Sequence, residues 1–128
     1  METIIAKRVA PALGPYSHAI ADNQLIFCSG LLPVGPDGSL VEGDLEAQVR
    51  RVFDNIAEVL AAAGSSLDHV LKTTVFMTDL GRFADMNRIY ADYFPGRRPA
   101  RTTVEVARLP LGASIEVEVI ARTLVAIP

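Results

Sequence analysis

The sequence predicts a single α+β domain in which two helices cover one face of a β-sheet, with the elements in the order β-β-α-β-α-β-β. The chain has 128 residues, half of them hydrophobic, which suits one core. Apolar residues recur at three- and four-residue steps over residues 44–63 and 79–93, as in amphipathic helices. Runs with strand character flank these two segments, so helices and strands mix along the chain.

The N-terminal part is expected to form a β-hairpin. Two short apolar runs, residues 18–21 and 25–29, are separated by Asp22 and Asn23, which favour tight turns. A loop rich in proline and glycine follows between residues 33 and 43.

Both predicted helices carry boundary signals. The first is expected to begin after Asp44, a favourable N-cap, and to end before Gly64. The second is expected to run from an Asp79 cap to about Tyr93, ahead of Pro95. The side of the first helix expected to face water consists of Glu46, Gln48, Arg50, Arg51, Asp54 and Glu58. The expected buried stripe of the second consists of Phe83, Met86, Tyr90, Tyr93 and Phe94.

Three further strands are predicted. Residues 70–78 are rich in β-branched side chains and should form a central strand. Residues 101–106 and 115–124 follow, joined by a loop at 109–112. If these two strands form a simple hairpin, Arg101 lies opposite Ile120, four strand positions from Glu116, which is on the order of 13 Å.

The last strand predicts a partner subunit. Its alternation places Ile115, Val117, Val119 and Ala121 on one face, suited to packing under helices, and Glu116, Glu118 and Ile120 on the other. A face that mixes carboxylates with aliphatic side chains is too polar for a hydrophobic core and too apolar for a fully solvated surface. We therefore expect a homo-oligomer.

Composition excludes several classes of function. A formal charge of −3 provides no basic field for a phosphate backbone, so we expect no nucleic-acid partner. The first residues include an early acid and no long apolar run, which predicts no secretory signal, no membrane association and a cytoplasmic location. Cys28 is the only cysteine and His18 and His69 are the only histidines, so no disulfide and no metal site are expected.

Two charged residues have properties that a catalytic site needs. Arg101 stands at a strand start, and its planar guanidinium matches a carboxylate with two parallel hydrogen bonds. Glu116 lies between aliphatic residues, where partial desolvation raises a carboxyl pKa. On the residues alone, a solvated arginine and a surface acid remain the simpler interpretations.

Other polar and sulfur-containing residues have ordinary structural explanations. Asn87, between Phe83 and Tyr90 on the second helix, needs hydrogen-bond partners and should support a backbone segment or a site. His18 is better explained as a packed residue than as a proton relay. Cys28, Met77 and Met86 are expected in the core. Glu118 is either an interface residue or a second acid, and the sequence leaves both open.

Successive motifs resemble the RidA/YjgF family of reactive-intermediate deaminases. The motifs are Gly14-Pro15-Tyr16-Ser17, Cys28-Ser29-Gly30, the run from Lys72 to Leu80, Asn87, Tyr93-Phe94-Pro95, Pro99-Ala100-Arg101, the run from Val104 to Pro110, and Ile115-Glu116-Val117-Glu118. They cover nearly the whole chain in the family order. The resemblance implies a mixed, chorismate-mutase-like sheet and a homotrimer with ligand clefts between subunits.

The resemblance also implies roles for individual residues. Arg101 matches the arginine that grips the substrate carboxylate, and Glu116 matches the acid that positions the hydrolytic water. The matching positions that line or support the cleft are Tyr16, Ser29, Gly30, Asn87 and Thr103. Thr103 stands where many members carry cysteine, so no thiol nucleophile acts there, and Leu31 stands where glutamine is common.

The implied activity is the hydrolysis of 2-imino acids derived from 2-aminoacrylate-type enamines to 2-oxo acids and ammonia, without a cofactor. The alternatives are a 3-aminoacrylate deaminase of pyrimidine breakdown and a non-catalytic module, sensor or chaperone-like, that binds 2-oxo acids. An endoribonuclease fits the acidic composition less well. Because Arg101 and Glu116 are expected too far apart to share one small acid, we also predict that Arg101 of one subunit meets Glu116 of its neighbour.

Overall fold

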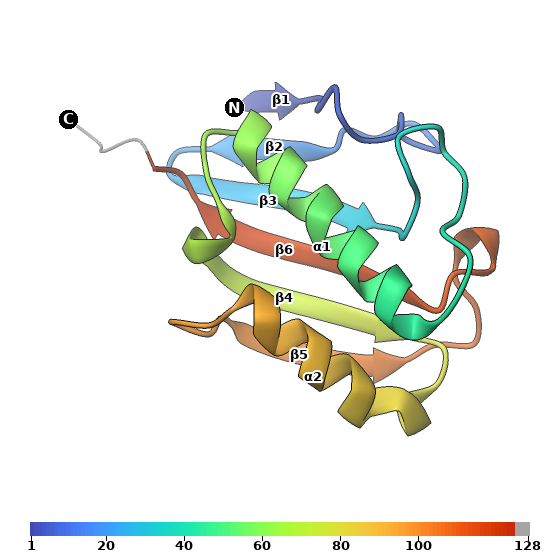
Figure 1. The fold of residues 1–128 in the computed structure, drawn as a ribbon. Coiled ribbons are helices and arrows are strands. Elements are labelled where there is room, and N and C mark those ends of the chain that lie inside the picture. The colour runs from blue at the N-terminus through green and yellow to red at the C-terminus, as the bar shows by residue number, and fades with distance from the viewer. Residues whose placement is uncertain (125–128) are drawn as a thin grey trace.

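The computed structural model describes residues 1–124, which form a six-stranded sheet with two helices packed on one side of it (Figure 1). The predicted α+β fold is confirmed, with one N-terminal strand more than the sequence suggested. The elements are β1 (Glu2–Ile4), β2 (Ala19–Asp22), β3 (Leu25–Leu31), α1 (Leu45–Ala62), β4 (Val70–Met77), α2 (Phe83–Tyr93), β5 (Ala100–Glu105) and β6 (Ile115–Arg122). Short 3-10 turns span Leu67–His69, Leu80–Arg82 and Pro110–Gly112.

The strand order is β1-β2-β3-β6-β4-β5, and only β4 and β5 run parallel. The expected hairpin between the last two strands is wrong. Strand β6 lies between β3 and β4, while β5 pairs with β4, so that Arg101 faces Thr73 instead of Ile120. The physical reason is the β4-α2-β5 crossover, which brings β5 to the far edge of β4. The alternation of side chains along a strand shows its two faces, but it does not show which other strand pairs with it.

Helix α1 begins and ends as predicted. The Asp44 carboxylate accepts a hydrogen bond from the Ala47 N–H at 3.0 Å, and Gly64 has a φ of +76° just after the helix. Gln48 is an exception on the side expected to face water, because it is buried. Its side chain donates to the Val41 carbonyl at 3.2 Å and accepts from the Ser114 N–H at 2.9 Å.

Helix α2 begins later than predicted. Asp79 accepts from the Gly81 N–H at 2.8 Å and therefore caps the short turn over Leu80–Arg82, while α2 itself starts at Phe83. Met86, Tyr90 and Phe94 are buried as expected. Phe83, by contrast, is 38% exposed, and Tyr93 is only partly buried.

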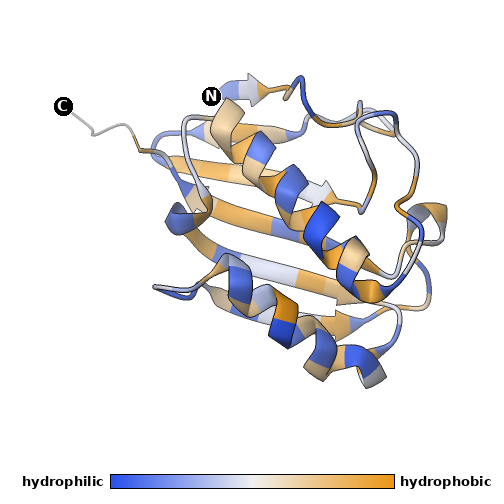
Figure 2. Cartoon of the chain, viewed as in Figure 1, coloured by the Kyte–Doolittle hydropathy of each residue, from blue (hydrophilic) through white to orange (hydrophobic). Residues whose placement is uncertain are grey.

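The two faces of the sheet differ. Figure 2 shows apolar strands beneath α1 and α2, whose outer surfaces are largely hydrophilic. As predicted, Ile115, Val117, Val119 and Ala121 are buried under the helices. The opposite face, which we call the open face, is covered by neither helix. Register and alternation place on it Phe27, Phe76, Val104, Glu116, Glu118 and Ile120.

Several single-residue predictions are confirmed. Cys28, Met77 and Met86 lie in the core, and burial raises the pKa of the Cys28 thiol to about 12. His18 is packed. Its Nδ1 accepts from the Ala6 N–H and its Nε2 donates to the Ala10 carbonyl, both at 2.9 Å, so each ring nitrogen is engaged by backbone and neither is available for a proton relay.

Within residues 1–124, no helix combines the length and the apolar character that crossing a bilayer requires.

Candidate active site

Arg101 projects from β5 to the helix side of the sheet. Its guanidinium carbon lies 4.7 Å from the centroid of the Tyr90 ring and 5.4 Å from that of Phe83. Both distances are in the range of cation–π contacts. The two aromatic residues are seven positions apart on α2 and therefore present their rings from the same side of that helix.

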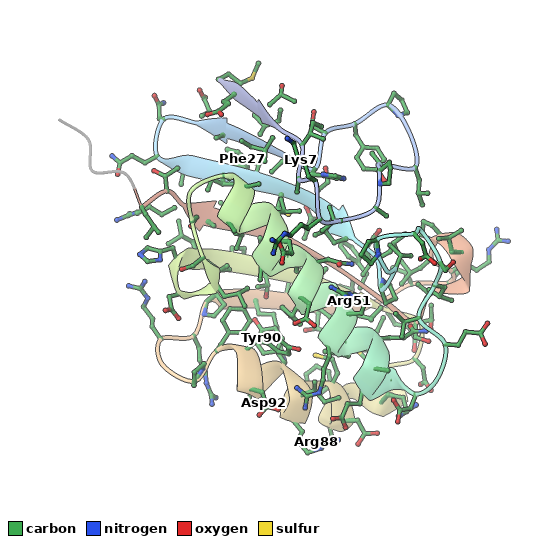
Figure 3. All side chains as sticks on the ribbon, turned by 45° about the horizontal axis from the view of Figure 1, so that its top comes forward. Lys7, Phe27, Arg51, Arg88, Tyr90 and Asp92 are labelled. Atoms are coloured by element: carbon green, nitrogen blue, oxygen red, sulfur yellow. The ribbon has the colours of Figure 1, made fainter. Side chains whose placement is uncertain are left out.

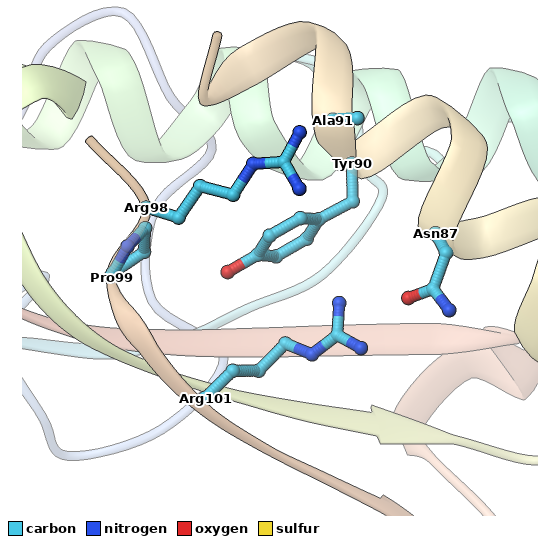
Figure 4. A pocket seen from close by; sticks show the side chains of 6 residues that line it. All are labelled: Asn87, Tyr90, Ala91, Arg98, Pro99 and Arg101. Atoms are coloured by element: carbon cyan, nitrogen blue, oxygen red, sulfur yellow. The ribbon is translucent and has the colours of Figure 1, made fainter. Parts of the chain in front are cut away.

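Arg101 opens onto a hollow of about 390 Å³ that we call the arginine hollow (Figure 4). Its lining consists of Asn87, Tyr90, Ala91, Arg98, Pro99 and Arg101. The lining contains two guanidinium groups and no carboxylate. An anion entering the arginine hollow therefore meets positive charge that no lining acid neutralises.

The Tyr90 side chain is buried between α2 and the sheet, whereas Arg88 and Asp92 lie on the outer side of the same helix (Figure 3). The hydroxyl groups of Tyr90 and Thr73 are hydrogen-bonded at 2.8 Å. Burial raises the pKa of Tyr90, although the bond to Thr73 and the charge of Arg101 oppose this rise. The phenol therefore stays protonated and its ring stays fixed beside the guanidinium.

On α2 and β5, the elements that position Arg101, two side-chain polar atoms are buried without a hydrogen-bond partner among the described residues. They are the Asn87 Oδ1 and the Thr103 Oγ1. Thr103 lies two residues after Arg101 on β5 and thus on the same face. Asn87 was expected to support a backbone segment or a site; its Oδ1 has no hydrogen bond to a backbone segment among the described residues, and the residue lines the arginine hollow. Buried polar atoms without a partner are rare in proteins, and a bound water, an ion or a catalytic role is a common explanation for them.

Glu116 lies on the other side of the sheet, in close contact with Gly30. A Cβ atom at Gly30 would lie 2.9 Å from the Glu116 Cδ, so the end of the Glu116 side chain would have to shift. Gly30 falls in a bulge of β3 between Cys28 and Leu31, where the pairing with β6 shifts. The bulge thus brings bare backbone against the carboxyl group.

Partial burial raises the pKa of the Glu116 carboxyl, and the negative charge of Glu118 adds to the rise. The two acids are two positions apart on β6 and share the open face. A carboxylate with a raised pKa is a stronger base towards water than an ordinary one, provided that it is still ionised at the working pH.

Tyr16, Ser29 and Gly30 lie together near the end of β3. The Ser29 hydroxyl donates to the Ser17 carbonyl at 2.7 Å, and the Tyr16 hydroxyl accepts from the Leu13 N–H at 3.1 Å. Tyr16, Gly30 and residues 10–13 line a second, largely apolar hollow of about 40 Å³. Leu31 also lines it but belongs mainly to the core.

The predicted site residues thus form two groups within one chain. Arg101 with Asn87 and Thr103 faces the helices, and Glu116 with Gly30 belongs to the open face. In register, Arg101 is level with Thr73 and Glu116 with Phe76, three residues along β4 and two strand spacings across, or roughly 14 Å. The predicted separation was similar, but its hairpin geometry was wrong, and the opposite faces were not foreseen.

Sequence reasoning missed Phe83, Tyr90 and Arg98 as site residues. The two aromatic residues were interpreted as core because they follow the helical period, and Arg98 carried no motif. The available signal was the spacing of Phe83, Asn87 and Tyr90 along one stripe, which the structure turns toward Arg101.

A metal centre has no support among residues 1–124, where no group of three or more His, Cys, Asp or Glu side chains could hold an ion.

The protein is thus a single α+β domain with two helices on one face of a mixed sheet and an arginine-lined hollow beside one of the helices. The sequence model of a family described as Endoribonuclease L-PSP matches residues 7–123. The chain therefore belongs to the RidA/YjgF family, which the motifs resemble.

Individual relatives agree with this assignment. Over 121 residues the chain is 46% identical to Reactive Intermediate Deaminase A, chloroplastic, of Arabidopsis thaliana, covering 94% of this chain and 65% of that protein. It is similar to the Rid-family protein YyfA of Yersinia pestis, with 48% identity, a TM-score of 0.92, and 95% and 98% of the two chains covered. It is also similar to E. coli TdcF with bound serine, with 36% identity, a TM-score of 0.91 and the same coverage.

Proposed function

We propose that the protein is an imine deaminase that hydrolyses small 2-imino acids, such as 2-iminopropanoate and 2-iminobutanoate, to 2-oxo acids and ammonia. The reaction takes place in clefts between the subunits of a homotrimer. Arg101 of one subunit binds the substrate carboxylate, and Glu116 of its neighbour positions the water. Asn87 and Thr103 line the cleft from the first subunit, and Tyr16, Ser29 and Gly30 line it from the second.

One observation carries this proposal: Arg101 and Glu116 lie on opposite faces of the same sheet. A substrate of six or seven non-hydrogen atoms does not reach from one to the other within a chain. A second copy that docks on the open face brings its own Arg101 toward this Glu116. The name of the Arabidopsis relative supports deaminase chemistry, and the bound serine in TdcF supports a small amino-acid-like ligand.

The chemistry follows from the two charged groups. An enamine tautomerises to the imine, and two parallel hydrogen bonds from Arg101 fix its carboxylate. Glu116 takes a proton from water as the water oxygen bonds to the imine carbon. That proton passes to the nitrogen and gives a carbinolamine. Its hydroxyl proton is then transferred to the nitrogen as the C=O bond of the 2-oxo acid forms, the carbon–nitrogen bond breaks, and ammonia leaves. Water is the only co-reactant, and because such imines already decay in water, a modest reduction of the barrier is sufficient.

The direct test generates 2-aminoacrylate or 2-iminobutanoate in situ with a dehydratase and follows imine loss with and without the protein. Arg101→Ala removes a bidentate charged contact worth about 2–5 kcal/mol and should slow the reaction tens- to thousands-fold. Arg97→Ala, a nearby arginine outside the arginine hollow, is the matched control. A folded Arg101→Ala protein with an unchanged rate rejects the assignment.

A complementation test addresses the intersubunit cleft. Arg101→Ala and Glu116→Ala proteins should each be inactive, and mixed assemblies should recover part of the activity, because some junctions then combine two intact halves. No recovery despite demonstrated subunit exchange contradicts the shared cleft.

Three other activities are separated by the imine-loss assay together with a binding measurement and an RNA-cleavage assay. Faster loss of 3-aminoacrylate than of 2-aminoacrylate favours a deaminase of pyrimidine breakdown, and binding of 2-oxo acids without acceleration favours a sensor or chaperone-like module. The description of the family names an endoribonuclease, so RNA cleavage is assayed alongside, although the net charge of −3 argues against it. A cytoplasmic location and the absence of a nucleic-acid partner stay predictions.

A further inference from the structure

A second cation shares the arginine hollow with Arg101. We propose that Arg98 is a specificity-determining residue that binds a second acidic group of the substrate, so that 2-imino acids whose side chain ends in a carboxylate are preferred. This inference rests on the proposed function, and it deepens that function by naming the class of substrate.

Charge is the first argument. The six residues that line the arginine hollow include no carboxylate, and within residues 1–124 neither Arg98 nor Arg101 takes part in an ion pair. Arg50, Arg82 and Arg88, by contrast, each have a carboxylate oxygen within 3.5 Å. Two unpaired guanidinium groups in one concave site concentrate positive potential, and a ligand with two negative charges benefits from both.

Geometry is the second argument. Figure 4 shows the side chains of Arg98 and Arg101 on either side of the Tyr90 ring, both directed into the arginine hollow. They are three residues apart, Arg98 in the segment before β5 and Arg101 as the second residue of β5, at most about 10 Å along an extended chain. Pro99 restricts the backbone between them, which helps to keep this spacing. A five-carbon acid with a carboxylate at each end can therefore contact one guanidinium with each end.

Size is the third argument. Roughly 30 Å³, the share of one water molecule in the liquid, is an upper bound for one bonded non-hydrogen atom, so the six such atoms of 2-iminopropanoate fill at most about 180 Å³, less than half of the hollow's 390 Å³. The ten non-hydrogen atoms of 2-iminoglutarate fill about 300 Å³ on the same basis. The longer, doubly charged acid thus uses space and charge that the smaller acid leaves unused.

The neighbouring Arg97 provides a matched control because it has the same charge and a different environment. Its guanidinium donates to the Asp68 carbonyl at 3.0 Å, and it lines a separate hollow with His69 and Arg122. Replacing Arg97 removes one positive charge from the same loop without changing the lining of the arginine hollow.

The test compares two stable 2-oxo acids by calorimetry. They are 2-oxoglutarate and 2-oxohexanoate, in which an ethyl group replaces the distal carboxylate. The wild type should bind 2-oxoglutarate more tightly. Arg98→Gln should weaken the binding of 2-oxoglutarate about two- to fivefold, as expected for an exposed ion pair, and should change that of 2-oxohexanoate less than twofold. Arg98→Lys should keep most of the preference, and Arg97→Gln should alter neither constant more than twofold.

Three results would overturn the inference: no preference in the wild type, equal losses for both acids in Arg98→Gln, or an Arg97→Gln effect as large as that of Arg98→Gln. Arg101→Ala separates these results from a failure of the proposed function, since it should abolish binding of both acids. A wild type that hydrolyses mono-acid imines through Arg101 but does not favour the diacid refutes only the role of Arg98.

Discussion

The guanidinium of Arg101 is held by aromatic rings instead of by a carboxylate. Contacts with Tyr90 and Phe83 occupy the group without neutralising it, so its N–H donors remain available to an incoming acid. An ion pair would have fixed the side chain equally well and at the same time removed its charge. The exposed Phe83 is explained by this contact, because a residue that only filled the core would be buried.

We expect Phe83→Leu to weaken the binding of 2-oxobutanoate about two- to fivefold, because a cation–π contact at an exposed site contributes about 0.5–1 kcal/mol. Leucine keeps apolar area but lacks the ring. Phe83→Tyr, which keeps the ring, should bind as the wild type does. Calorimetry of the three proteins provides the measurement, and equal affinities for the leucine and tyrosine variants would show that the ring does not position Arg101.

Glu118 should tune the pH dependence of Glu116. Burial and the Glu118 charge both raise the pKa of Glu116, so Glu118→Gln removes one cause and the pKa should fall. The carboxylate form then persists to lower pH, and the acidic limb of the profile of kcat/KM should move to lower pH. Glu58→Gln on α1 is the control. A limb that stays in place, or moves to higher pH, contradicts the assignment of Glu116 as the base.

At the scale of elements, the bulge in β3 determines which residue faces Glu116. Gly30→Ala should reduce kcat about ten- to hundredfold, because a side chain at 2.9 Å displaces the carboxyl group and a misplacement of about 1 Å has costs of this order. Gly96→Ala, where nothing lies within 4 Å, should keep wild-type activity. Circular dichroism confirms folding, and a fully active Gly30→Ala protein would contradict the role of the close contact.

The helices were predictable because their signals are local. The 3.6-residue period and the Asp44 cap are properties of adjacent residues, and they located α1 closely. The start of α2 was predicted too early because an aspartate such as Asp79 can cap a short 3-10 turn as well as a helix. Gln48 was predicted to face water because it lies on the polar side of the helix. The two loops that bury it, at Val41 and Ser114, are distant in sequence and leave no local signal.

Strand pairing and the site were less predictable because both depend on contacts distant in sequence. Alternation correctly assigned the two faces of β6 but not its insertion between β3 and β4. Arg101 and Glu116 were identified by resemblance, since their residue types alone suit any surface. The separation of the two groups by the sheet follows from the pairing of β5 with β4, which no local pattern encodes.

At the scale of the whole molecule, the open face is the surface where we expect subunits to associate. Phe27 is 46% exposed and pairs with Ile120 of β6. Ile120 shares the open face of β6 with Glu116 and Glu118. An exposed aromatic side chain on a sheet face suggests an interaction surface.

Phe27→Asp should convert the proposed trimer into monomers and abolish the proposed imine hydrolysis, because it adds a third carboxylate to a face that must lose water. Light scattering after size exclusion measures the mass. Ile5→Asp, at a residue that is 62% exposed and outside the open face, should leave mass and activity unchanged. A Phe27→Asp protein that keeps the wild-type mass excludes this face as the interface.

The division of Arg101 and Glu116 between two faces has a consequence for gene dosage. In the proposed closed ring of three, each subunit adjoins two others and contributes a different half to each junction. A chain that lacks both residues therefore disables two of the three junctions in any trimer it joins, whereas a chain that lacks one disables a single junction. Co-expressed with the normal protein, the doubly substituted chain should therefore be dominant-negative and lower the activity of the mixed trimers.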